Sequence, residues 1–128
     1  MINITLLLKR KPGTSKDDFK RAYENHAEIA MKHLGHLYVR YLRNYTIAQG
    51  AHAGNTSSAA DPNADTMFDA ITTITLKDRE SLAEMQRIAS TPEIFQEFIE
   101  DEEKWLDRSA KVVFTTEELS TEQRLEKA

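Results

Sequence analysis

The first ten residues constrain the fold most, because this short segment is apolar on both faces of a strand. It contains Leu6, Leu7 and Leu8 and is followed by Pro12-Gly13, which predicts a strand that ends before a turn. Successive side chains of a strand point to opposite faces of the sheet, so both faces need a cover. We expect helices of the same chain on one face and a second copy of the chain on the other.

The next segment predicts a helix that runs to about Leu34. Ser15 is followed three residues later by Asp18, which fits a helix cap, and Gly35 follows the last turn. Residues at three- and four-residue steps share one face of a helix. This face consists of Phe19, Ala22, Tyr23, His26, Ile29, Ala30 and His33, and we expect it to pack on the sheet.

The rest of the chain predicts three more strands and two more helices. β-Branched and aromatic residues indicate strands over residues 36–48, 67–76 and 110–116. A helix over residues 78–90 is followed by a short one that begins at Thr91-Pro92. The resulting order, βαββαβ, is typical of an α+β, ferredoxin-like fold with a four-stranded antiparallel sheet and helices on one face.

The chain is expected to form a single domain over residues 1–118. Residues 50–66 are rich in Gly, Ala, Ser, Asn and Asp and predict a flexible loop, and residues 119–128 predict a charged tail. The acidic residues between positions 97 and 103 predict a solvated helix face.

Composition limits the classes of function. The chain of 128 residues has no cysteine, which excludes thiolate chemistry, and its net charge of −4 disfavours nucleic-acid binding. The longest apolar run is too short to span a bilayer, and no signal peptide is evident. We therefore expect a cytoplasmic protein that binds neither nucleic acid nor membrane.

His26 is the first candidate for catalysis. It lies in the middle of the first predicted helix, on the face with the small residues Ala22 and Ala30, which leave room for a flat ligand. Near neutral pH an imidazole can accept a proton at one nitrogen and donate one from the other. The alternative is a histidine of the core, held by a carbonyl or carboxylate group.

Asp69 is the second candidate for catalysis, because it interrupts an apolar strand. A buried carboxylate needs a partner, and His26 or Arg40 would supply one. Pairing with His26 would also hold the imidazole in one tautomer. The alternative is an edge position at which Asp69 faces water.

Four further side chains are candidates for substrate binding. Tyr23 and Tyr41 offer hydroxyl groups, although aromatic residues of strands more often only pack. Arg40 could bind a carboxylate through two hydrogen bonds. His52 could reach a pocket from the predicted loop, the alternative being an exposed loop histidine. No residues stand at metal-ligand or nucleotide-binding spacing, so neither a metal site nor a cofactor is expected.

Several short motifs match a known family. They are Leu7-Leu8-Lys9-Arg10-Lys11-Pro12-Gly13, Phe19, Tyr23-Glu24-Asn25-His26-Ala27, Tyr41-Leu42-Arg43-Asn44-Tyr45, Phe68-Asp69-Ala70, Asp101-Glu102 and Trp105-Leu106-Asp107. Together they resemble the EthD-domain family of the dimeric α/β-barrel superfamily, over roughly residues 2–118. The chain is most similar to fungal members found with aromatic polyketide pathways, except that Glu28-Ile29 stands where those often carry Pro-Leu.

This resemblance implies a homodimer and a cofactor-free lyase that tailors an aromatic polyketide-type substrate. The reaction would be a decarboxylation, or a dehydration or cyclisation, with His26 as the group that transfers the proton. Two alternatives stay open. One is a cofactor-independent monooxygenase that acts on an anthrone-type ring, and the other is a dimer that binds a ligand without catalysis.

Overall fold

The computed structural model describes residues 1–49 and 65–121. Its elements are β1 (Ile2–Leu8), α1 (Lys16–Leu34), a 3₁₀ turn (Gly35–Leu37), β2 (Tyr38–Tyr45), β3 (Ala70–Leu76), α2 (Arg79–Ala89), α3 (Pro92–Glu102), a second 3₁₀ turn (Arg108–Ala110) and β4 (Val112–Glu117). Residues 50–64, which include His52 and most of the predicted loop, and residues 122–128 of the predicted tail lie outside the described residues.

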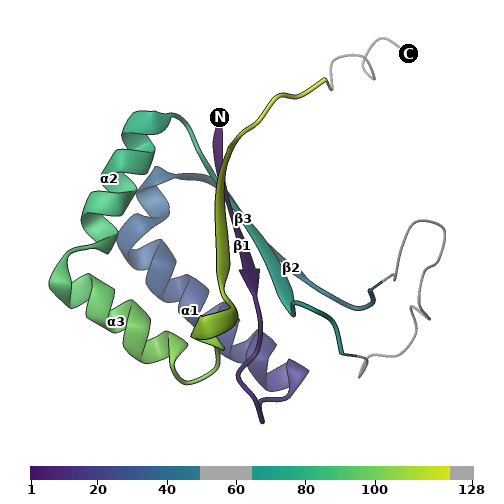
Figure 1. Ribbon diagram of the computed structural model, residues 1–128. Helices are drawn as coiled ribbons and strands as arrows, with labels where there is room; N and C mark the ends of the chain where they lie inside the picture. The colour runs from purple at the N-terminus through teal and green to yellow at the C-terminus, as the bar shows by residue number, and fades with distance from the viewer. Residues whose placement is uncertain (50–64, 122–128) are drawn as a thin grey trace.

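The strands form one antiparallel sheet in the order β2-β3-β1-β4. The three helices α1, α2 and α3 cover one face of this sheet, and no helix of the described residues lies on the opposite face (Figure 1). The expectation of a ferredoxin-like α+β fold is confirmed. None of the described helices is long and apolar enough to cross a membrane.

Local signals set the ends of the helices where the sequence predicts them. The Ser15 side chain accepts a hydrogen bond of 3.1 Å from the backbone N–H of Asp18, and α3 begins at Pro92 directly after Thr91. The strands are shorter than predicted. β3 begins only at Ala70, because the residues before it turn, with Thr66 donating a hydrogen bond to the carbonyl of Phe68.

The core lies between the helices and the sheet and has two parts. One part is aromatic, where Phe19, Tyr23 and Trp105 are all at most 2% exposed. The other is aliphatic and joins β1 to β3 through Ile4 and Ile74. Burying each such side chain stabilises the fold by about 1.5–3 kcal/mol, so these contacts fix α1 on the sheet.

The outward face of the sheet carries apolar side chains that the single chain leaves uncovered. Leu42, Ile71 and Phe114 are all exposed there, with Phe114 at 52%.

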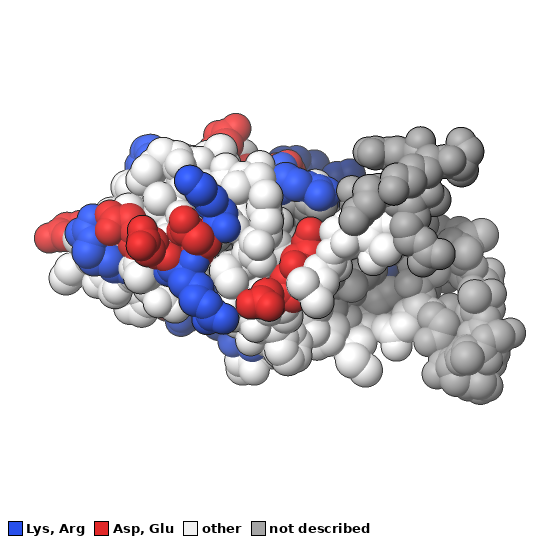
Figure 2. Space-filling view, turned by 90° about the horizontal axis from the view of Figure 1, so that it is seen from above, with Lys and Arg blue, Asp and Glu red and all other residues white. Residues whose placement is uncertain are grey.

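The helical side of the molecule carries charged side chains of both signs. Seen from above, acidic and basic side chains are interspersed over that side, without a surface of one sign in this view (Figure 2).

Candidate active site

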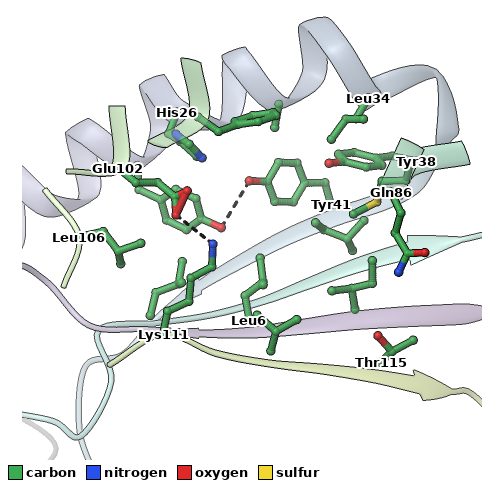
Figure 3. A pocket seen from close by; sticks show the side chains of 18 of the residues that line it. Leu6, His26, Leu34, Tyr38, Tyr41, Gln86, Glu102, Leu106, Lys111 and Thr115 are labelled. Atoms are coloured by element: carbon green, nitrogen blue, oxygen red, sulfur yellow. Dashed lines mark hydrogen bonds and ion pairs between the residues drawn. The ribbon is translucent and has the colours of Figure 1, made fainter. Parts of the chain in front are cut away.

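A cavity of about 270 Å³ lies between the helices and the sheet. Small-molecule sites usually span roughly 300–1,000 Å³, so this one suits a small ligand. Aliphatic residues make up much of its wall: Ile4, Leu6, Leu8, Leu34, Ile74, Leu82 and Met85. His26, Glu102 and Lys111 lie together at one end, while Gln86 and Thr115 lie at the other (Figure 3). The cavity is thus apolar along its length with charged groups at one end.

His26 is paired with the carboxylate of Asp101, one of the acidic residues that were predicted to form a solvated helix face. Its Nδ1 lies 2.8 Å from Oδ2 of Asp101, which projects from α3. The same Oδ2 accepts a hydrogen bond of 3.1 Å from the indole N–H of Trp105. Because a carboxylate only accepts hydrogen bonds, Nδ1 carries the proton and the neutral imidazole has its lone pair on Nε2.

The His26 ring is held in place by aromatic neighbours. Its side chain is 12% exposed, and ring centroids lie 5.3 Å away at Trp105, 5.5 Å at Phe98 and 6.2 Å at Tyr23. Among residues 1–49 and 65–121, none forms a hydrogen bond with Nε2, and the ring lies on the cavity wall (Figure 3). This arrangement can take a proton from a ligand in the cavity or deliver one to it.

Tyr23 and Tyr41, the two tyrosines predicted to bind substrate, both line the cavity. The Tyr41 hydroxyl donates a hydrogen bond of 3.3 Å to Tyr23, whose hydroxyl lies 2.6 Å from Oγ1 of Thr72. Burial raises the pKa of Tyr23 and of Tyr41, so both stay neutral at physiological pH. The hydroxyl of Tyr23 is satisfied within the protein, and the oxygen of Tyr41 remains able to accept a hydrogen bond.

Glu102 and Lys111 were not predicted as site residues. Glu102 is only 6% exposed, and its Oε1 accepts a hydrogen bond of 2.9 Å from Nζ of Lys111. The prediction of a solvated acidic face is therefore wrong for Asp101 and Glu102, because these two positions of α3 turn towards α1 and the sheet. The sequence signal that could have indicated burial of this region was Trp105, a large apolar residue four positions after Asp101.

Asp69 is buried at 4% exposure rather than facing water at an edge, but its partners are not those predicted. The backbone N–H of Arg10 donates a hydrogen bond of 2.9 Å to Oδ2, and Nζ of Lys9 lies 3.6 Å from the same atom. The predicted pairing with His26 or Arg40 is wrong. Since Leu8 is paired with Ala70 across the sheet, the residues that directly follow β1 lie next to Asp69.

Arg40 lies on the other face of the sheet from the cavity. Side chains alternate along β2, so Tyr41 points to the helices and the exposed Arg40 points outward. The structure therefore does not bring Arg40, a predicted substrate-binding residue, to the cavity. Its neighbour Arg43 donates two hydrogen bonds, of 2.7 and 2.9 Å, to the carboxylate of Glu24.

Within the described residues, no group of three or more potential ligands could hold a metal ion.

Comparisons with known proteins identify relatives of this chain. A family model described as the EthD domain matches residues 11–109, and no curated protein matches. An EthD-family protein from Bacillus halodurans has a TM-score of 0.58 at 20% identity, with 93% of this chain and 100% of the other covered. A dimeric protein of unknown function and ferredoxin-like fold from Bacteroides fragilis gives 0.53 at 8%, covering 91% and 95%. An antibiotic biosynthesis monooxygenase gives 0.53 at 12%, covering 94% and 100%. These structural likenesses show the fold.

Proposed function

The chain belongs to the EthD domain family, and we propose that it is a cofactor-free lyase that acts on a small aromatic polyketide-type ketone. His26 would transfer the proton, and Asp101 would orient it. One observation carries this proposal: the imidazole is held by a carboxylate through Nδ1 and borders an apolar cavity on its other side. Proton transfer by a positioned histidine accelerates reactions by about 10²- to 10⁴-fold.

Decarboxylation of a β-keto acid uses the protonated form of His26. The bond between the α-carbon and the carboxylate breaks, and its electron pair forms the enol double bond as carbon dioxide leaves. The imidazolium donates its Nε2 proton to the ketone oxygen, which becomes the enol hydroxyl. Asp101 stabilises the imidazolium before this step, because the two lie 2.8 Å apart.

Dehydration of a β-hydroxy ketone uses the neutral form of His26. Nε2 takes the α-proton, and the electron pair forms the enolate. The enolate expels the β-hydroxyl group, which leaves as water with the proton that the imidazolium returns. An enolate also forms first in a cofactor-independent oxygenation, so oxygen consumption separates that reaction from the lyase.

Two probe compounds test the proposal. Benzoylacetate reports decarboxylation through the appearance of acetophenone, and anthrone in air reports oxygenation through oxygen consumption. We expect the protein to accelerate acetophenone formation without consuming oxygen, and the variant His26→Ala to lose this acceleration. Oxygen consumption that depends on His26 would instead support the monooxygenase. Turnover of neither probe, or unchanged turnover in His26→Ala, contradicts catalysis by this histidine.

We further propose that two copies associate through the outward face of the sheet. The exposed Leu42, Ile71 and Phe114 support this proposal, and so does the dimeric neighbour of similar fold. Sedimentation velocity tests it. We expect a dimer for the native chain and a monomer for Phe114→Glu, with exposed Phe95→Glu on α3 as the control that leaves the dimer intact. A native chain that sediments as a monomer contradicts the proposal.

A further inference from the structure

The ion pair between Glu102 and Lys111 is poorly explained by stability. Glu102 is the last residue of α3, where the negative end of the helix dipole disfavours a carboxylate. Its side chain is also only 8% exposed, and removing a charge from water costs about as much as the attraction of its partner returns. A buried carboxylate paired with a lysine in this position therefore points to a role in ligand binding.

The position of the pair relative to His26 suggests that role. Glu102 and Lys111 line the same end of the cavity as His26, and Figure 3 shows the Lys111 side chain reaching from the sheet side towards that end. The ammonium group has three donors, and its hydrogen bond to Glu102 uses one. The Lys111 side chain is still 31% exposed, so the other donors can reach a ligand oxygen.

We propose that Lys111 forms an oxyanion subsite, which binds the enolate or phenolate oxygen of the ligand, and that Glu102 positions the ammonium group. This inference deepens the proposed function and rests on it, because proton removal by His26 places negative charge on such an oxygen, and decarboxylation raises the electron density on it as the carboxylate leaves. A fixed positive charge in a largely apolar cavity stabilises that developing charge. The ligand class is thus an acidic phenol or an enolisable ketone with an apolar body.

Binding of a chromogenic phenol tests the subsite without turnover. 4-Nitrophenol absorbs differently as phenol and as phenolate, so titration across pH gives the affinity of each form. 4-Nitroanisole has nearly the same shape and cannot ionise. We expect the native protein to bind the phenolate about 10- to 100-fold more tightly than the neutral phenol, the usual scale of a charge-assisted hydrogen bond.

The variants test whether the preference for phenolate comes from Lys111 or from another charged group. Lys111→Met should remove the preference for phenolate and leave the affinity for 4-nitroanisole unchanged, and the exposed Lys104→Met is the matched control. Because Lys111→Met leaves the buried Glu102 unpaired, the double variant Glu102→Gln with Lys111→Met removes both charges and keeps the test valid if the single variant unfolds.

The outcomes distinguish this subsite from the proposed lyase. Loss of the preference in the Lys111 variants, with retention in Lys104→Met, supports the subsite whether or not benzoylacetate is turned over. Absence of any phenolate preference in the native protein overturns it. So does a preference that persists in the double variant, or one that is lost only in His26→Ala.

Discussion

Helices α1 and α3 are joined by two histidine–carboxylate pairs of similar length, one through Nδ1 of His26 and the other through Nε2 of His33. His26 lies 2.8 Å from Asp101, and two turns further along α1, His33 lies 2.7 Å from Glu97. The ring of Phe98 lies between them, 5.5 Å from His26 and 6.0 Å from His33. These nitrogen–oxygen distances alone would not distinguish a catalytic pair from a structural one.

The second partner of each carboxylate shows the difference. Asp101 also accepts from the indole of Trp105, which is 2% exposed, whereas Glu97 also accepts at 3.0 Å from the exposed ammonium of Lys32. His26 lines the cavity, and His33 is not among the residues that line it. The inner pair, His26 with Asp101, therefore has both a fixed orientation and access to a ligand. The outer pair, His33 with Glu97, lacks both.

Replacing each histidine in turn is expected to give the largest difference in reaction rate between the two pairs. His26→Ala should lower the rate with benzoylacetate by about 10²- to 10⁴-fold, the usual contribution of a general acid or base. His33→Ala is the matched control and should keep the rate within about twofold, since general acid–base catalysis needs direct reach to the ligand. Equal losses in the two variants would show that the histidines act only by joining the helices.

The next contrast comes from the carboxylates. In Asp101→Asn the neutral amide no longer stabilises the imidazolium, and it can donate to Nδ1, which moves the lone pair of the neutral ring away from Nε2. We expect a rate loss of at least about tenfold, up to the ~10⁴-fold known when an aspartate that orients a catalytic histidine becomes asparagine. Glu97→Gln should leave kcat unchanged. A steady-state comparison of both variants decides this, and an unaffected Asp101→Asn would remove the orienting role.

A smaller effect on stability should follow from the second donors. Trp105→Phe keeps an aromatic ring but removes the N–H that Asp101 accepts, and we expect a loss of about 1–3 kcal/mol in the free energy of unfolding. Lys32→Met removes the corresponding donor of the outer pair and should cost at most about 1 kcal/mol, as for other exposed ion pairs. Urea denaturation of both variants measures the difference. A larger loss in Lys32→Met would reverse the comparison.

The smallest effect concerns the response of the outer pair to pH. The hydrogen bond from His33, followed by that from Lys32, lowers the pKa of Glu97 below its ordinary value of about 4.5. Its contribution to stability is therefore complete above that pH and is lost as the pH falls through the lower folded value. Glu97→Gln should melt slightly below the native protein at pH 7, and the gap should close in acid. A gap that widens on acidification contradicts this assignment.

Much of the fold could be predicted, because it depends on signals within short segments. Ser15 and Pro92 mark helix starts through their own backbone chemistry, and the apolar steps from Phe19 to Ala30 place α1 on the sheet. Strand ends were less accurate. The turn before β3 also involves a hydrogen bond of 2.9 Å between Thr66 and Thr46, which lie far apart in sequence, and no local pattern reports it.

The candidate site could be predicted only on the side of α1 and β2. His26 and Tyr23 follow from helical spacing, and Tyr41 follows from strand alternation. Asp101 could not be assigned as the partner of His26, because that contact depends on how α3 packs against α1. Asp69 was assigned instead, since an acid within an apolar strand is conspicuous in sequence, yet it lies beside Lys9 and Arg10 at the end of β1.

The tautomer of His26 is the most direct test of the account, and ¹⁵N NMR of the ring nitrogens measures it. In the native protein above the pH at which the ring is protonated, we predict a proton on Nδ1 and a lone pair on Nε2, because Asp101 only accepts. In Asp101→Asn we predict that the tautomer is no longer fixed in this form. A native His26 with its proton on Nε2, or a tautomer that is unchanged in Asp101→Asn, would contradict the claim that Asp101 prepares this imidazole to act on a ligand in the cavity.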